Sequence, residues 1–385
     1  MNKQRLTEIE YLRAFAFLAV VLQHTIGHYA YIQGTSLADG VMLGFLLLAA
    51  KFAVPMFIFI TGLVLFYNDK GKVPYGTFLR KRSKDILLPY LLWSILYSII
   101  DNRSALTDWT FLRELGLDLV TGKASYHLWY IVMIFQFYLA YPFLRSGILW
   151  AHKQLQNRYA LYMVLIATGV FYAWLTTQQS AFEAAAAALA IPVLTPLFTE
   201  YIDRNALFFF FYFVLGAFTG LYVQHVLQAV YRWRAAIWTF FGIAVTVMGF
   251  RIINHFTWSP ELTIHYNDTF LVNPPMALFL TLSLPAMLAA AVEFGRSAPM
   301  RWRRALSFIG AYSYTAYLAH ALLLVAATEL TDLLLPRAVP TMLTLVAFAL
   351  CSGLSVGAAV LLRKASLRLS KRAPGTAAKP KQITG

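Results

Sequence analysis

Long apolar runs separated by short polar segments form the main pattern along this 385-residue chain. Several runs reach the ~20 residues that an α-helix needs to cross the hydrocarbon core of a bilayer. The pattern predicts an all-α membrane protein, a bundle of about ten transmembrane helices. The expected spans are residues 11–31, 43–67, 86–101, 127–147, 159–176, 206–224, 235–254, 271–292, 307–328 and 340–362. We expect the alanine-rich segment 182–198, which contains Glu183, Pro192 and Pro196, to be a re-entrant or interfacial piece.

Positive charge sets the expected orientation of these spans. With the N-terminus in the cytoplasm, about 24 of the 32 Lys and Arg residues fall in cytoplasmic segments and about 6 in outer loops. We therefore expect both termini to be cytoplasmic. The composition, 59% hydrophobic and 13% charged, agrees with a membrane protein. Topology and contact with anionic lipids explain the net charge of +15, so this charge indicates no nucleic-acid partner.

The chain divides into one transmembrane domain, residues 1–368, and a basic tail, residues 369–385. The tail is rich in Pro, Gly and Lys, and we expect it to be disordered on the cytoplasmic side. Acidic and basic residues crowd the start of the first span, so it is not expected to be a cleavable signal. The single cysteine, Cys351, excludes a disulfide framework.

Two ionisable residues, Arg13 and His24, lie in the first span. Their separation corresponds to about 20° of rotation and about 16 Å of rise along a helix, so both point to one side at different depths. Ionisable groups inside a membrane are costly and mark functional sites by default. In the alternative interpretation, Arg13 reaches the interface and pairs with Glu10, and His24 is hydrogen-bonded within the bundle.

A basic cluster stands at the start of the third span. Arg80, Lys81, Arg82 and Lys84 precede Leu88 and the rest of this helix. Such clusters often serve as cytoplasmic anchors that fix topology. Arginine at a helix start also suits phosphate binding, because the guanidinium group makes bidentate contacts with phosphate oxygens.

Polar and aromatic residues mark two further spans. His127, Trp129 and Tyr130 open the fourth span, where an aromatic belt at the outer interface is the simplest interpretation. In the ninth span, Ser313, Tyr317 and His320 follow each other at helical spacing and share one face. A polar stripe in an apolar helix faces protein or water, and hydrogen bonds between helices would also explain it.

In this order, the features resemble the acyltransferase-3 family of integral membrane O-acyltransferases, which modify bacterial surface polysaccharides. The resemblance covers about residues 8–365, and in detail it is most similar to the Gram-positive exopolysaccharide branch. It rests on the Arg-x10-His signature, on residues 54–62 (Val-Pro-Met-Phe-Ile-Phe-Ile-Thr-Gly), on residues 212–216 and on the clusters described above. Thr61 stands where the family usually has Ser, and the spacing of Arg80 and Arg82 differs from the common Arg-x-x-Arg form. The second difference leaves open which cation binds.

The resemblance implies transfer of an acyl group, usually acetyl, from cytoplasmic acyl-CoA to a hydroxyl of an extracellular or lipid-linked glycan at a bacterial cell membrane. No metal is expected. The chemistry needs a general base with a pKa near neutrality, for which histidine is suited. The expected roles are His24 as base, Tyr317 or His320 at the oxyanion, Arg13, Arg80, Arg82 and Lys84 at the phosphates of coenzyme A, and His127, Trp129, Tyr130 and Ser313 at the substrate.

Two other classes stay open. A secondary transporter also has many helices and buried charges, but it should show an inverted repeat and helices broken near the midplane. A polysaccharide exporter or a non-catalytic scaffold is the second alternative. If the enzyme interpretation holds, outer segments 102–126, 177–205 and 255–270 should border the acceptor entrance. Aromatic residues in and near these segments are suited to sugar contact: Trp109, Tyr126, Trp258 and Tyr266.

Overall fold

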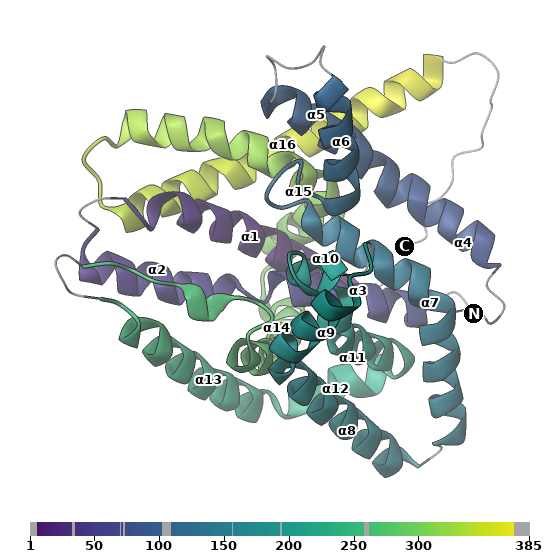
Figure 1. Cartoon of the computed structure of the whole chain (residues 1–385). Helices are drawn as coiled ribbons and strands as arrows, with labels where there is room; N and C mark the ends of the chain where they lie inside the picture. The colour runs from purple at the N-terminus through teal and green to yellow at the C-terminus, as the bar shows by residue number, and fades with distance from the viewer. Residues whose placement is uncertain are drawn as a thin grey trace.

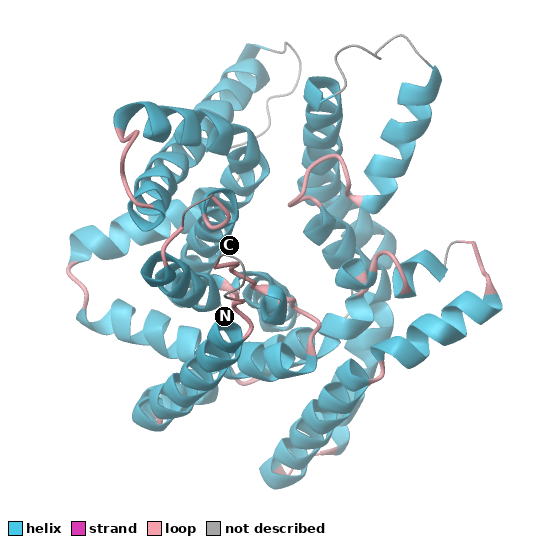
Figure 2. Cartoon of the chain, turned by 60° about the vertical axis from the view of Figure 1, so that its left-hand side comes forward, coloured by secondary structure: helices cyan, strands magenta, loops and turns pink. Residues whose placement is uncertain are grey.

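The computed structural model describes residues 6–32, 35–69, 71, 74–101, 109–155, 157–192, 195–257 and 262–372. Within these residues the chain is helices and loops, with one isolated β-bridge between Thr257 and Thr263 (Figure 2). The prediction of an all-α membrane protein is confirmed.

Nine helical segments in the described ranges are long and apolar enough to cross a membrane, and a bent pair of helices makes a tenth. Each predicted span overlaps one of these segments. The segments are α1 (Thr7–Tyr29), α2 (Leu37–Ala50) with α3 (Ala53–Tyr67), α4 (Tyr75–Arg82) continuing through the π-helical turn η1 (Ser83–Leu87) into α5 (Leu88–Asp101), α7 (Trp129–Gln154), α8 (Arg158–Thr177), α13 (Arg234–Asn254), α14 (Pro274–Ser297), α15 (Met300–Leu334) and α16 (Pro340–Arg372). The bent pair is α11 (Phe210–Leu221), preceded by η3 (Ala206–Phe209), and α12 (Val223–Arg232), with an angle of 103° between its arms. The cytoplasmic location of the termini stays a prediction.

Shorter helices complete the chain: α6 (Trp109–Thr121), α9 (Gln179–Leu189), α10 (Thr195–Phe198), η2 (Ile202–Arg204) and η4 (Asn267–Thr269). The segment predicted to be re-entrant or interfacial forms α9 and α10 and is not among the spans. Its Phe182 ring stacks on Phe198, 5.8 Å between ring centres. At the other end of the chain, α16 reaches Arg372, and residues 373–385 of the predicted tail lie outside the described residues.

Helix α1 lies against α15 and α16, and the three helices run side by side in Figure 1. Its buried Ala14, Ala16 and Ala19 have short side chains, which let neighbouring helices come close. On α15, a Cβ at Gly310 would lie 2.0 Å from the carbonyl oxygen of Glu10, so only glycine fits this crossing. The close approach brings the polar face of α15 next to α1.

Helices α3 and α11 cross with direct backbone contact. A Cβ at Gly62 would lie 2.3 Å from the Phe213 carbonyl oxygen, and one at Gly216 would lie 2.0 Å from that of Phe59. Gly220 makes the same approach one turn later, at 2.4 Å from the Leu63 carbonyl oxygen. Small residues spaced four apart commonly mediate such contacts between membrane helices. This crossing holds α3, and with it Thr61, against the bundle.

The second predicted span, residues 43–67, is interrupted at Lys51 and Phe52, between α2 and α3. Pro55 has no N–H group, so the carbonyl of Lys51 lacks its usual helical donor. The neighbouring carbonyl of Ala50 accepts a hydrogen bond from the Gln23 side chain on α1, at 2.8 Å. A backbone break at membrane depth needs such partners. The break leaves Lys51 half-buried within an otherwise apolar segment.

Candidate functional site

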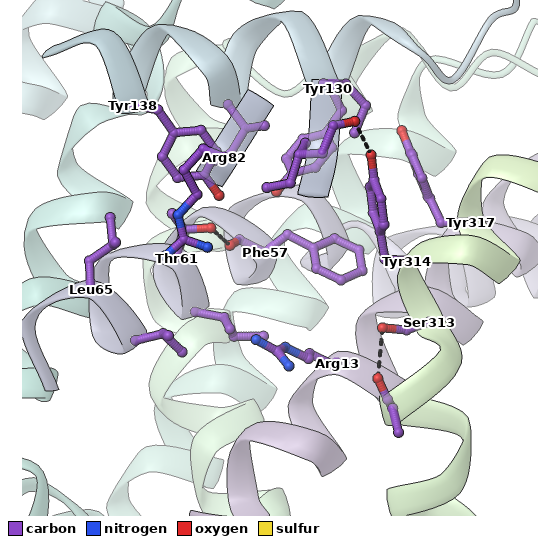
Figure 3. Close-up of a pocket in the computed structure, with 17 residues that line it drawn as sticks. Arg13, Phe57, Thr61, Leu65, Arg82, Tyr130, Tyr138, Ser313, Tyr314 and Tyr317 are labelled. Atoms are coloured by element: carbon purple, nitrogen blue, oxygen red, sulfur yellow. Dashed lines mark hydrogen bonds between the residues drawn. The ribbon is translucent and has the colours of Figure 1, made fainter. Parts of the chain in front are cut away.

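A cavity of about 270 Å³ lies between α1, α3, α7 and α15, beside the junction of α4 and η1. We call it the arginine cavity (Figure 3). Its polar lining comprises Arg13, Thr61, Arg82, Tyr130, Tyr138, Ser313, Tyr314 and Tyr317. The hydroxyl groups of Thr61 and Ser313 donate to backbone carbonyls of their own helices. The charged groups that line this space are the two guanidinium groups.

Arg13 and Arg82 take part in no ion pair with a carboxylate in the part of the chain that the structure describes. The Nε atom of Arg82 is buried without a hydrogen-bond partner. The Arg82 guanidinium lies 5.4 Å from the centre of the Phe78 ring and 5.3 Å from that of Tyr138, so its position is fixed by packing. Glu10, the partner expected for Arg13 in the structural interpretation, accepts a hydrogen bond from Ser307. Two arginines on one cavity favour an anionic ligand.

The basic cluster is divided between the cavity and the surface. Arg82 ends α4 and is half-buried, whereas Arg80, Lys81 and Lys84 are exposed. The chain passes from α4 into a π-helical turn at this point, and such turns often occur at functional sites. Of the four cations, only Arg82 lines the arginine cavity.

A second cavity, of about 240 Å³, adjoins the first. We call it the histidine cavity, and it is lined by His24, Lys51, His127, Trp129, Asp203 and Thr269 among others. Tyr130 and Tyr317 line both cavities and therefore form the wall between them. Arg13 and His24 thus lie on the same side of α1, each in a different cavity and both near Tyr317.

Three histidines from three parts of the chain meet at the histidine cavity. The rings of His24 and His320 stack with their centres 5.3 Å apart, and His127 meets His320 edge to face at 4.5 Å. Nδ1 of His320 lies 2.5 Å from the Tyr317 carbonyl oxygen, and its buried Nε2 has no partner. His24 and His127 line the cavity, whereas His320 is completely buried behind them.

Neighbouring hydroxyl groups and a tyrosine ring hold the histidine cluster in place. The Tyr317 hydroxyl donates to the backbone carbonyl of His127, and Ser125 is hydrogen-bonded to Nδ1 of His127 at 3.2 Å. The turn before this segment requires Gly122, which has a φ of +73° and whose Cβ would lie 2.7 Å from the Cα of Trp129. Tyr126 lies against His24, with 4.5 Å between ring centres.

Lys51 and Asp203 are cavity residues to which sequence reasoning gave no role. The sequence shows Lys51 as the one cation besides Arg13 inside an apolar run. It does not show which residues of other helices lie around Lys51. Asp203 comes from η2, in a part of the chain that the helical periodicity leaves unplaced. It pairs with Arg204 at 3.3 Å, and Arg204 also donates to the carbonyl of Thr121. No group of three His, Cys, Asp or Glu side chains that could hold a metal ion occurs among the described residues.

A third and larger cavity, of about 680 Å³, adjoins the histidine cavity. We call it the polar vestibule, and it is lined by Lys51, Thr176, Gln179, Tyr266, Asn267 and Asn273 among others. Lys51, Thr269 and Phe270 line both the vestibule and the histidine cavity. Segments 177–205 and 255–270, expected to border an entrance, thus contribute Gln179 and Tyr266. Of the other predicted aromatics, Trp109 is exposed on α6 and Trp258 lies outside the described residues.

Comparison with known proteins gives one family and several relatives. The family model described as "Acyltransferase domain" matches residues 6–364. A Bacillus subtilis (strain 168) protein named "Putative membrane-bound acyltransferase YfiQ" is 23% identical over 352 residues, which are 90% of this chain and 89% of that protein. A Staphylococcus aureus (strain MRSA252) protein named "Probable poly-beta-1,6-N-acetyl-D-glucosamine export protein" is 25% identical over 372 residues, 94% of each chain. No solved structure matches the chain.

Proposed function

Because this chain belongs to the acyltransferase-3 family, we propose that it moves an acyl group, expected to be acetyl, from cytoplasmic acyl-CoA to a hydroxyl of an extracellular or lipid-linked glycan. Its helices and bacterial relatives make it a multi-pass bacterial membrane protein. The observation that carries the proposal is the shared wall of Tyr130 and Tyr317, with two arginines on one side and the histidines on the other.

The arginine cavity is the proposed donor site. The guanidinium groups of Arg13 and Arg82 would contact the phosphates of coenzyme A, since neither is neutralised by a carboxylate ion pair in the described residues. A cavity of about 270 Å³ is small for a whole coenzyme, so it would hold the diphosphate and the adjoining part of the pantetheine arm, with the thioester extending toward the histidine cavity. Arg80 and Lys84, exposed on the adjoining turns, would meet the parts of the donor that remain outside.

The histidine cavity is the proposed place of reaction. His24 would remove the proton of the acceptor hydroxyl as its oxygen bonds to the thioester carbonyl carbon. The carbon–sulfur bond then breaks, and the same proton returns to the departing sulfur of coenzyme A. The contacts of Tyr317 and His320 suit positioning, because the Tyr317 hydroxyl already donates to the His127 carbonyl and His320 stacks behind His24. Trp129, Tyr130, His127 and Ser313 would contact the substrates, since each lines a cavity.

His24→Ala tests the base. In purified protein reconstituted into liposomes, this change should reduce acyl transfer by about 10²–10⁴-fold, the usual contribution of a general base. His28→Ala is a matched control, because His28 lies one turn further along α1 and is exposed. The amount of each variant in the membrane is measured alongside. Retention of more than about a tenth of the activity by His24→Ala would remove His24 from this role.

Polysaccharide export is the second candidate function. The name of the Staphylococcus aureus relative suggests it, and the break between α2 and α3 and the bend between α11 and α12 are features that transporters also use. Mass spectrometry of surface glycans from a deletion strain separates the two functions. Loss of an O-acyl group with unchanged polymer export supports the enzyme, and loss of exported polymer supports transport.

A further inference from the structure

The polar vestibule has the chemistry of a sugar-binding site. Its lining combines hydroxyl and amide side chains, such as Thr177, Ser180 and Asn273, with the ring of Tyr266. Hydroxyls and amides offer both donors and acceptors, as sugar hydroxyl groups require. The position of the vestibule beyond the histidine cavity makes it the route by which an acceptor would reach His24.

Lys51 is the charged group at the inner end of the vestibule. None of the described residues that line the vestibule is acidic. In the histidine cavity Asp203 is the lining carboxylate, and it forms its ion pair with Arg204 rather than with Lys51. A half-buried cation inside an apolar span is costly unless something compensates its charge. The lack of a carboxylate paired with Lys51 among the described lining residues favours an anionic ligand at this position.

The arrangement of the cavities indicates which of the two substrates, donor or acceptor, carries the anionic group that contacts Lys51. Lys51 lines the vestibule and the histidine cavity but not the arginine cavity, where the donor phosphates are proposed to bind. Lys51 is therefore on the acceptor side of the wall formed by Tyr130 and Tyr317. This location favours contact with the acceptor over contact with the donor.

We propose that the polar vestibule is the acceptor site and that Lys51 binds an anionic oxygen group, carboxylate or phosphate, near the accepting hydroxyl of the glycan. The inference rests on the proposed function and adds a substrate class to it: glycans that carry negative charge. A carboxylate would belong to an acidic sugar, and a phosphate to a lipid carrier.

Four acceptor probes with acetyl-CoA test the inference in the reconstituted protein. The first pair is a tetrasaccharide that contains glucuronate and the same tetrasaccharide with its carboxyls converted to methyl amides. The second pair is a neutral tetrasaccharide on a polyprenyl diphosphate and the same sugar on a polyprenol. In one of the pairs, the charged member should have a KM lower by about tenfold or more, because hydrogen bonds between charged groups are the stronger ones. The pair that shows the difference identifies the source of the charge.

Substitutions at Lys51 assign the preference to this residue. Lys51→Gln should bring the KM ratio of the pair to about one, and Lys51→Arg should keep most of it, since the charge remains. Lys123→Gln is the control, because Lys123 pairs with Glu200 and does not line the vestibule. Thermal unfolding of each variant checks the fold. Binding of each probe to the protein is also measured by titration without donor. The preference for charged probes can then be determined even where transfer is slow.

Two results would overturn the inference alone: transfer with no charge preference in either pair, or a preference that survives in Lys51→Gln. A different result separates the proposed function from the inference. If none of the probes is acylated and no coenzyme A is released from acetyl-CoA, the proposed function fails, and the acceptor role of Lys51 fails with it.

Discussion

At the scale of single residues, Arg80 and Arg82 differ in their surroundings although they share one basic cluster. Residues two apart in a helix are rotated by about 200° relative to each other, so Arg80 and Arg82 point in nearly opposite directions. Arg82 packs over Phe78 and Tyr138 and lines the arginine cavity, whereas Arg80 faces outward. The structure therefore makes Arg82 the residue of this cluster on which donor binding should depend.

Arg82→Ala is expected to weaken coenzyme A binding by about tenfold or more, because a charge-assisted contact with phosphate is lost. Arg82→Lys should restore only part of the affinity, since an ammonium group cannot make bidentate contacts. Calorimetric titration of the reconstituted protein with coenzyme A measures both. Lys81→Ala, an exposed cation next to Arg82, serves as control. Normal affinity in both Arg13→Ala and Arg82→Ala would mean that these cations only anchor the topology.

At the scale of elements, glycine contacts between helices decide where the cavity residues meet. The crossing of α3 and α11 leaves no room for a Cβ at Gly62, Gly216 or Gly220. Because α3 also carries Phe57 and Thr61 into the arginine cavity, its separation from α11 would disturb the cavity lining. Stability and donor binding should therefore change together when this crossing is altered.

Gly216→Ala should destabilise the protein by about 1–3 kcal/mol, the usual cost of overpacking, because the added methyl group would lie 2.0 Å from the Phe59 carbonyl oxygen. A lower midpoint of thermal unfolding in detergent is the expected readout. The matched control is Gly242→Ala on α13, where a Cβ meets nothing within 4 Å. Equal midpoints for the two variants would contradict a backbone contact at this crossing.

At the scale of the whole molecule, three cavities follow one another through the bundle. The polar vestibule shares Lys51 with the histidine cavity, and the histidine cavity shares Tyr130 and Tyr317 with the arginine cavity. The charge bias of the loops predicts that Arg13 and Arg82 lie toward the cytoplasm. The vestibule would then open toward the outer side.

This orientation predicts the sidedness of the reaction. In sealed vesicles of known orientation, a glycan on the extracellular side should be acylated when acyl-CoA is supplied on the cytoplasmic side. Vesicles with the two substrates exchanged are the control and should give no product. Reaction only with both substrates on the cytoplasmic side would contradict a path through the membrane.

The sequence alone determined the features that depend on local order. Apolar runs predict spans because crossing a bilayer requires a fixed helix length, and each predicted span overlaps a helix in the structure. Helical periodicity likewise places Arg13 and His24 on one side of α1, and Ser313 and Tyr317 on one face of α15. These relations hold within a single helix, so they do not depend on which helices pack together.

The tertiary structure decided which of these residues meet. The hydrogen bond from Gln23 to the break beside Lys51, the position of Asp203 in the cavity of His24, and the contact of His24 with His320 all join residues far apart in the chain. Such contacts follow from the angles and distances at which helices cross, and these depend on pairs such as Gly310 and Glu10. A hydropathy pattern describes each segment by itself and does not show which distant residues come into contact. For this reason the wall of Tyr130 and Tyr317, and the separation of arginines from histidines, became visible only in the folded chain.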